Sequence, residues 1–345
     1  MTINQPPLQP TPVGALRFNT DSSKLEYYDG NQWVNITSDS PEVHTGGARG
    51  VAGGGWNPGV VSTIKYYTIS STGSEEAFGN LTRGGRNFGA CGSRIRGVFG
   101  GSFPQAYQAT IDYITFSVTG NAIDFGDLSL GRTGDGALAS STRGLFAGGY
   151  SYSPGPTAAT DIMDYVTIAS TGDAKDFGDL ANAKEFNNNP GCSSPTRGLW
   201  MATASPSAGS SNTIEYVTIA TKGNTADFGD ISDTGTRSSG GACANATRAL
   251  YGGGANPSVL NTIDYVTIAS LGNSIDFGDL TQTNYHMGVF SSSIRGVWLG
   301  GRNPDLTNKI DYVNIATTGN ALDWGDMYDQ IALFATTSNG HGGLG

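Results

Sequence analysis

A segment of 20 residues recurs six times along most of the chain. Its clearest copy runs from Asn261 to Leu280, and a tyrosine marks the same place in every copy. These tyrosines stand 47 to 52 residues apart, at Tyr66, Tyr113, Tyr165, Tyr216, Tyr265 and Tyr312. An aromatic residue always follows 12 residues later, as Phe78, Phe125, Phe177, Phe228, Phe277 and Trp324. The period is typical of β-propeller blades, and the constant spacing predicts two strands paired in a fixed register.

Each copy predicts a unit of four strands, which we name A to D in chain order. A glycine seven residues after the tyrosine, followed by Ser, Asn or Asp, predicts a two-residue hairpin turn between strands C and D. Strand A is short and apolar. Strand B begins at an arginine, namely Arg49, Arg96, Arg143, Arg197, Arg248 and Arg295. Paired glycines end strand B in every copy except the fourth, which reads Met201-Ala-Thr-Ala204.

This pattern resembles the kelch repeat. The resemblance covers Arg49 to Gly345 and rests on the Gly-Gly strand end, the tyrosine strand and the aromatic residue 12 positions on. It implies an all-β fold with a six-bladed propeller over residues 44–345. Because the first copy begins at strand B and residues 330–338 match strand A, we expect the C-terminal strand to complete the first blade. Such a closure satisfies backbone groups that a free sheet edge would expose.

Loops on one face of the predicted propeller vary in length. Since strands alternate in direction, the B-C and D-A loops lie on the same side, and only these loops differ in length between copies. Variable loops on a rigid scaffold favour a recognition surface. Its aromatic candidates are Trp56, Phe103, Tyr107, Tyr150, Tyr152, Phe186 and Tyr285. The alternative is that loop length drifts without function and that some of these rings pack between blades.

Acidic residues repeat beside the strand C tyrosine, as Asp112, Asp164, Glu215, Asp264 and Asp311. We expect these carboxylates to pair with the strand B arginines, because repeated arginine usually pairs with carboxylate. Acidic residues also repeat beside the strand D aromatic residue, as Asp124, Asp176, Asp227, Asp276 and Asp323. The first copy breaks both patterns, with Lys65 and Ala77 in these two positions. The acidic repeats supply too few converging oxygens for a calcium site. The sequence therefore predicts no metal site and no cofactor.

Cysteines, histidines and unique acidic residues indicate no catalytic site. Three cysteines, Cys91, Cys192 and Cys243, occupy equivalent strand A positions in different blades, so we expect buried thiols rather than disulfides. The histidines His44, His286 and His341 lack the spacing of a metal site or catalytic dyad. Glycosidase chemistry needs paired acids, and the non-repeated Asp135, Glu185 and Asp305 form no evident pair. We therefore expect a non-enzymatic protein, with a polysaccharide-degrading enzyme as the alternative.

The N-terminal region differs in character from the repeats. Prolines at positions 6, 7, 10 and 12 predict an extended arm over residues 1–13. Residues 14–43 predict a three-strand meander and a linker, with Phe18, Tyr27 and Trp33 on its apolar surface. So few residues cannot bury that surface alone. We expect a docking tag, and a cap on the propeller is the alternative.

Charge and hydropathy exclude several partners. The net charge is -10 and the isoelectric point about 4.6, which argues against nucleic acid, since phosphate binding needs clustered Lys and Arg. No apolar stretch reaches the roughly 18 residues of a membrane helix, so we expect no membrane insertion. Met1 to Gly14 lacks the basic and then apolar order of a signal peptide.

A second resemblance concerns tailed phages. The run Gly14-Ala-Leu-Arg-Phe-Asn-Thr-Asp21 and the run Leu25-Glu-Tyr-Tyr-Asp-Gly-Asn-Gln-Trp33 are similar to a segment common in phage fibre and other virion proteins. The repeats are similar to those in structural proteins of marine phages, including cyanophages. The resemblance implies a virion protein on the tail or capsid surface. Residues 1–43 would dock to other virion proteins, and the variable face would meet a host surface glycan or protein. A virion protein of this kind is expected to be a homo-oligomer. The alternative is an architectural tail component or capsid decoration that contacts virion proteins alone.

Overall fold

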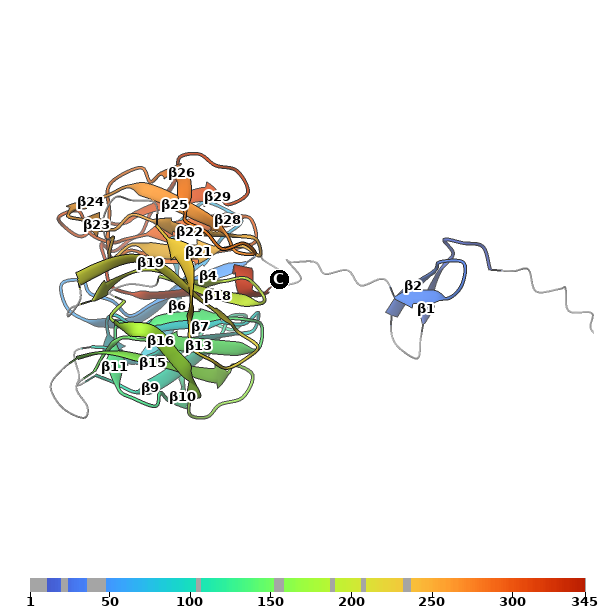
Figure 1. The fold of residues 1–345 in the computed structure, drawn as a ribbon, viewed down its shortest axis with the longest axis horizontal. Coiled ribbons are helices and arrows are strands. Elements are labelled where there is room, and N and C mark those ends of the chain that lie inside the picture. The colour runs from blue at the N-terminus through green and yellow to red at the C-terminus, as the bar shows by residue number, and fades with distance from the viewer. Residues whose placement is uncertain are drawn as a thin grey trace, which may run out of the picture. The chain divides into compact units, whose positions relative to one another are not determined.

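The computed structural model describes residues 11–19, 24–35, 48–103, 107–151, 158–186, 190–205, 209–231 and 237–344. The chain divides into two compact units, Met1–Val43 and His44–Gly345. The prediction of an all-β fold is confirmed. The described residues form strands β1 to β31 and one short 3₁₀ helix, η1 (Gly342–Leu344), and they include no α-helix (Figure 1).

The N-terminal unit holds one antiparallel sheet. Its strands are β1 (Leu16–Asn19), β2 (Lys24–Tyr28) and β3 (Trp33–Asn35), joined in the order β1-β2-β3. Leu16 pairs with Tyr27 and Phe18 with Leu25, and because alternate side chains share a face, these four form one apolar face. All four are exposed, Leu16 by 63% and Phe18 by 61%. The prediction that Trp33 belongs to this apolar face is wrong, because Trp33 pairs with Tyr28 and lies with Arg17 on the opposite face. This small sheet therefore leaves its apolar face without cover from its own residues.

The larger unit contains five four-stranded antiparallel sheets, one six-stranded sheet and one two-stranded pair within its described residues. Sheet 1 consists of β31 (Ala335–Ser338), β4 (Arg49–Gly53), β5 (Val61–Thr68) and β6 (Glu76–Gly85). Sheet 2 consists of β7 (Gly89–Gly92), β8 (Arg96–Gly100), β9 (Thr110–Thr115) and β10 (Ile123–Asp127). Sheet 3 consists of β12 (Gly136–Ala139), β13 (Arg143–Ala147), β15 (Ala158–Thr167) and β16 (Lys175–Lys184), with β11 (Arg132–Thr133) and β14 (Tyr150–Ser151) at its side.

The remaining sheets repeat this order. Sheet 4 consists of β17 (Gly191–Ser193), β18 (Arg197–Ser205), β19 (Gly209–Thr218) and β20 (Ala226–Asp230). Sheet 5 consists of β21 (Gly241–Ala244), β22 (Arg248–Gly252), β25 (Thr262–Thr267) and β26 (Ile275–Asp279), beside a small pair, β23 (Ala255–Asn256) and β24 (Ser258–Val259). Sheet 6 consists of β27 (Gly288–Ser291), β28 (Arg295–Leu299), β29 (Lys309–Asn314) and β30 (Leu322–Asp326). The C-terminal strand β31 therefore lies in the first sheet, over Ala335–Ser338.

Neighbouring sheets share the hydrophobic core. The strand A elements contact one another in the series β7, β12, β17, β21, β27 and β31, and β31 contacts β7. An apolar cluster lies between each pair of neighbouring sheets, including sheets 6 and 1, where Tyr67 and Ile69 meet Val297 and Trp324. Each buried large side chain contributes about 1.5–3 kcal/mol. The core is thus spread over six interfaces.

The predicted two-residue turn between strands C and D is wrong. In sheet 5 the connection spans residues 268–274, between β25 and β26. The six turn glycines do have positive φ, between 148° and 159°. In five of them the amide donates to the carbonyl of the strand D aromatic residue in the preceding sheet, for example Gly272 to Phe228 at 2.8 Å. The constant spacing between the strand C tyrosine and this glycine reflects the contact between sheets, and a rule for local turns does not include such contacts.

The predicted pairing of strand B arginines with the repeated carboxylates is also wrong. Each arginine lies over its strand C tyrosine, at 4.6 to 4.9 Å from the ring centroid. It then donates to a backbone carbonyl of the next sheet, as Arg197 does to Ile268 at 2.8 Å. Neighbouring residues on a strand point to opposite sides. The acid beside the tyrosine therefore cannot meet the arginine that covers the ring.

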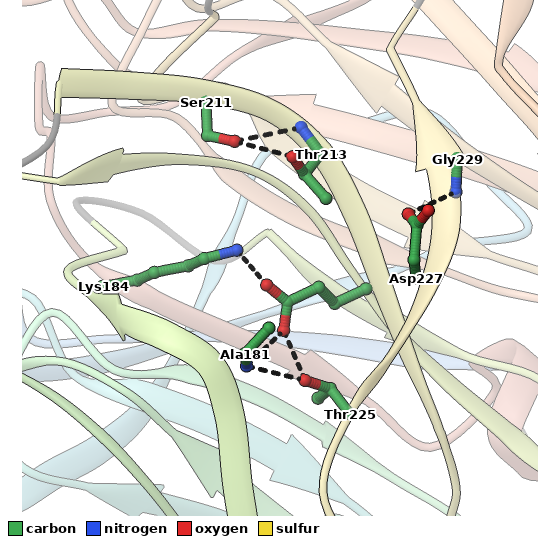
Figure 2. Close-up of polar contacts among 8 residues, drawn as sticks. Ala181, Lys184, Ser211, Thr213, Thr225, Asp227 and Gly229 are labelled. Carbon is green, nitrogen blue, oxygen red and sulfur yellow. Dashed lines mark hydrogen bonds and ion pairs between the residues drawn. The ribbon is translucent and has the colours of Figure 1, made fainter.

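The repeated carboxylates face the preceding sheet instead. Glu215 accepts the Ala181 amide at 3.1 Å, the Thr225 hydroxyl at 2.5 Å, and the Lys184 ammonium (Figure 2). Asp112, Asp164 and Asp311 accept equivalent amides, and Asp112, Asp164 and Asp264 pair with Arg83, Arg132 and Arg237. In sheet 1 Glu75 takes this place, because it accepts the Tyr328 amide and pairs with Lys65, both at 2.8 Å. The broken first copy is thus compensated by a neighbouring residue.

Candidate binding surface

Loops from neighbouring sheets are joined at five equivalent places. The B-C loop of one sheet forms a backbone bridge with the D-A loop of the preceding sheet. The bridges are Ala332 to Trp56, Arg86 to Phe103, Thr133 to Tyr150, Ser238 to Ala255 and Tyr285 to Arg302. Positive φ values at the preceding glycines, such as Gly54 at 68° and Gly253 at 65°, turn strand B into these bridges. The scaffold therefore presents the same position from each of these sheets.

The side chains at this position break the repeat. Sheets 6, 1, 2 and 3 carry Arg302, Trp56, Phe103 and Tyr150, whereas sheet 5 carries Ala255. We call Arg302, Trp56, Phe103 and Tyr150, together with Tyr107, the aromatic arc. Phe103 and Tyr107 have ring centroids 6.1 Å apart, and Tyr107 and Tyr150 are 6.3 Å apart. All five side chains are partly exposed. A scaffold that is uniform elsewhere thus concentrates large, accessible rings on one part of its loop face.

The structure separates the sequence candidates. Trp56, Phe103, Tyr107 and Tyr150 belong to the arc, and Tyr285 lies beside it through its bridge to Arg302. Phe186 does not belong to the exposed set, since it is 2% exposed and packs with Trp200 in the core between sheets 3 and 4. Its D-A loop turns the ring inward, where burial of apolar surface is favourable. Tyr152 lies outside the described residues.

Two arginines of this surface escaped the sequence analysis. The Arg302 guanidinium lies 5.4 Å from the Trp56 ring centroid, and the Arg86 guanidinium lies 5.0 Å from that of Phe103. Neither forms an ion pair with a carboxylate in the described ranges. The available signal was the arginine at a position that is aromatic in three other copies. The loops differ in length, so the equivalence of Arg302 with these aromatic residues follows from the structure and not from the sequence spacing.

An inner rim borders the arc. Asn87, Gly134, Ser239, His286 and Leu333 all have left-handed backbone conformations, with φ from 57° to 66°. Backbone hydrogen bonds connect them, since Leu333 donates to His286 at 3.2 Å, Asn87 to Leu333 at 2.9 Å and Gly134 to Asn87 at 2.9 Å. The ring of His286 lies 4.6 Å from that of Tyr285. Burial, together with the charges of Arg302 and Arg86, lowers the pKa of His286 to about 4.

The centre of the larger unit is nearly filled. A cavity of about 40 Å³ is lined by residues of all six strand A elements, and none of the lining residues is acidic. Cys91, Cys192 and Cys243 line it as buried free thiols, as expected, and burial raises the pKa of Cys192 to about 12. His341 and Gly342 of the C-terminal segment also line it. Such a volume holds only a few water molecules, so the centre offers no room for a sugar.

The unique acidic residues differ in burial, and Glu185 lies beside Gly134, the neighbour of Asp135. Asp135 is 1% exposed and lies close to Gly89 and Gly101, and burial raises its pKa to about 7. Glu185 is partly buried, and burial raises its pKa. Asp305 is exposed. No hydrogen bond joins any two of these three described carboxyl groups. Among the residues described, no three His, Cys, Asp or Glu side chains are grouped to hold a metal ion.

Comparison with known proteins gives no assignment. No protein-family model matches the chain, and neither does any curated protein sequence. Within the described part of the chain, no helix is long and apolar enough to cross a membrane.

Proposed function

We propose that the larger unit is a six-bladed, kelch-like β-propeller closed by its own C-terminal strand. Five four-stranded sheets and one six-stranded sheet support this proposal, as does the pairing of β31 with β4 in sheet 1. The strand B arginines support it too, because Arg295 of sheet 6 donates to Ile69 at 3.0 Å, just as Arg96 of sheet 2 donates to Ile168 of sheet 3. The contact between sheets 6 and 1 thus repeats the contact between consecutive sheets.

We propose that the chain is a non-enzymatic virion protein of a tailed phage that presents this propeller for recognition of a host surface. The aromatic arc carries the proposal, because it breaks the repeat symmetry where large rings are accessible. Aromatic and arginine side chains are enriched where proteins bind partners. The phage assignment rests on the resemblance of the N-terminal segment and of the repeats. It gives the protein a place on the tail or capsid surface.

We propose that the N-terminal unit docks the protein to the particle. Its apolar face consists of Leu16, Phe18, Leu25 and Tyr27, all exposed in that unit. The opposite face carries Arg17, which pairs with Glu26 at 2.8 Å and has its guanidinium 4.2 Å from the Trp33 ring centroid. An apolar face of this kind suits a complementary virion protein or a sister chain. A homo-oligomer would present several propellers at once.

The test measures binding of the full chain to host cells and to particles that lack it. Tyr107→Ala should abolish cell binding, whereas Tyr328→Ala, which alters an exposed tyrosine outside the arc, should leave it intact. Phe18→Asp should abolish particle binding, and Gln32→Asp, which adds the same charge at an exposed turn, should not. Binding to particles alone would indicate an architectural subunit. Binding to neither would refute the proposal, and release of sugars from host polysaccharide would refute its non-enzymatic part.

A further inference from the structure

Two guanidinium groups flank the inner rim, and neither pairs with a carboxylate in the part of the chain that the structure describes. Arg302 bridges to Tyr285, the neighbour of His286, and Arg86 is the neighbour of Asn87. The backbone of Leu333 links the two sides, since it donates to His286 and accepts from Asn87. Both arginines are close enough to His286 to lower its pKa. Arg86 and Arg302 therefore belong to one electropositive place on a chain whose net charge is -10.

Polar atoms at this place lack partners. The Nε atoms of Arg86 and Arg302, Oδ1 of Asn87 and Nδ1 of His286 are each buried without a hydrogen-bond partner. Buried polar groups in native proteins are nearly always paired, so a local group of unpaired atoms needs an explanation. Three of these four atoms are side-chain nitrogens, and two of them belong to guanidinium groups that carry a fixed positive charge. The two fixed positive charges favour an anion as their partner, whereas Oδ1 of Asn87 would accept a hydrogen bond from a donor group.

We propose that this place, formed by Arg86, Asn87, His286 and Arg302, binds the oxoanion of an acidic sugar. This proposal deepens the proposed host recognition and rests on it. A carboxylate or sulfate matches the guanidinium geometry, and either can come from a uronic acid or from a sulfate ester. Trp56 and Phe103 adjoin the two arginines, and Tyr107 and Tyr150 extend the aromatic surface from there. Amphipathic rings of this kind accept the apolar face of a sugar.

The ligand test uses the full chain and three oligosaccharides of equal length: a polyuronate, a sulfated galactan and the neutral galactan. We expect the chain to bind one or both acidic probes and not the neutral one, and the preferred probe identifies the oxoanion. Arg86→Gln and Arg302→Gln should each weaken binding by about ten- to a hundredfold. Lys222→Gln is the matched control, because it removes one charge from an exposed Lys222 that lies 5.2 Å from the Tyr165 ring. Its affinity should be unchanged.

A second measurement reports on the place itself. Bound acidic sugar would neutralise the field of the two arginines, so the NMR titration of His286 should shift to higher pH when the probe is added, with His286→Gln assigning the signal. Equal binding of the neutral probe, or wild-type affinity in the Arg86→Gln, Arg302→Gln double variant, would overturn the inference. If that double variant still binds host cells while Tyr107→Ala does not, the proposal of host recognition is supported and the proposal of an acidic ligand is refuted. If both variants still bind host cells, both proposals are refuted.

Discussion

His341 forms its two hydrogen bonds as a neutral imidazole ring. The Gly343 amide donates to Nδ1 of His341 at 3.1 Å, so Nε2 carries the proton and donates to the Gly92 carbonyl at 2.8 Å. A proton on Nδ1 would face the Gly343 amide and break that hydrogen bond. Burial accordingly lowers the pKa of His341 from 6.5 to about 4. We predict that acid weakens the closure of the central cavity by this segment.

The sign and size of the effect follow from linkage. The pKa of His341 is lower in the folded chain than in the unfolded chain, so the unfolded chain binds more protons between pH 6.5 and 4. The free energy of unfolding therefore decreases as the pH is lowered through that window. A shift from 6.5 to about 4 corresponds to a loss of about 3 kcal/mol by pH 4. The His341 residue keeps some solvent exposure, so this figure is an upper value.

The assay compares wild type with His341→Gln, whose amide retains a donor for Gly92. Denaturant unfolding at pH 7 and pH 4 should show the stability advantage of wild type over the variant shrinking by up to about 3 kcal/mol. The comparison cancels the contribution of His286, which titrates in the same window. An advantage that is independent of pH, or a His341 NMR signal that titrates near 6.5, would refute the reasoning.

Two further predictions concern buried positions. Because burial raises the pKa of Asp135 from 3.8 to about 7, wild type should lose up to about 4 kcal/mol as pH rises from 4 to 7, and Asp135→Asn should remove that loss; parallel unfolding curves for both proteins would contradict it. A Cβ at Gly343 would lie 1.9 Å from the Ala139 carbonyl oxygen, whereas one at Gly59 meets nothing within 4 Å. Gly343→Ala should therefore cost about 1–3 kcal/mol in unfolding free energy and Gly59→Ala less than about 0.5 kcal/mol, and equal melting temperatures would exclude a tightly packed C-terminal segment.

The sequence by itself determined the all-β fold and the strands. A tyrosine and an aromatic residue 12 positions apart mark strands C and D, and the observed pairs share T-shaped ring contacts such as Tyr265 with Phe277 at 5.7 Å. Local spacing carries this information because the side-chain period of a strand is fixed by its backbone geometry. The repeat period likewise identified the three cysteines as equivalent strand A positions. Phe18 and Tyr27 of the N-terminal sheet were likewise identified as apolar-surface residues, whereas Trp33 lies on the opposite face with Arg17.

Only the tertiary structure decided which groups meet between sheets. Repeated arginines and acids looked like partners in the sequence, yet alternation points them to opposite sides, and each acid finds its partners in the preceding sheet. Glu75 replaces the missing acid of the first copy, although it lies outside the repeated acidic position. Phe186 packs into the core, which the sequence spacing does not predict. Arg86 and Arg302 came together because loops of unequal length converge in space on one inner rim. Contacts between neighbouring sheets depend on how those sheets stack, and the linear order of residues does not specify that geometry.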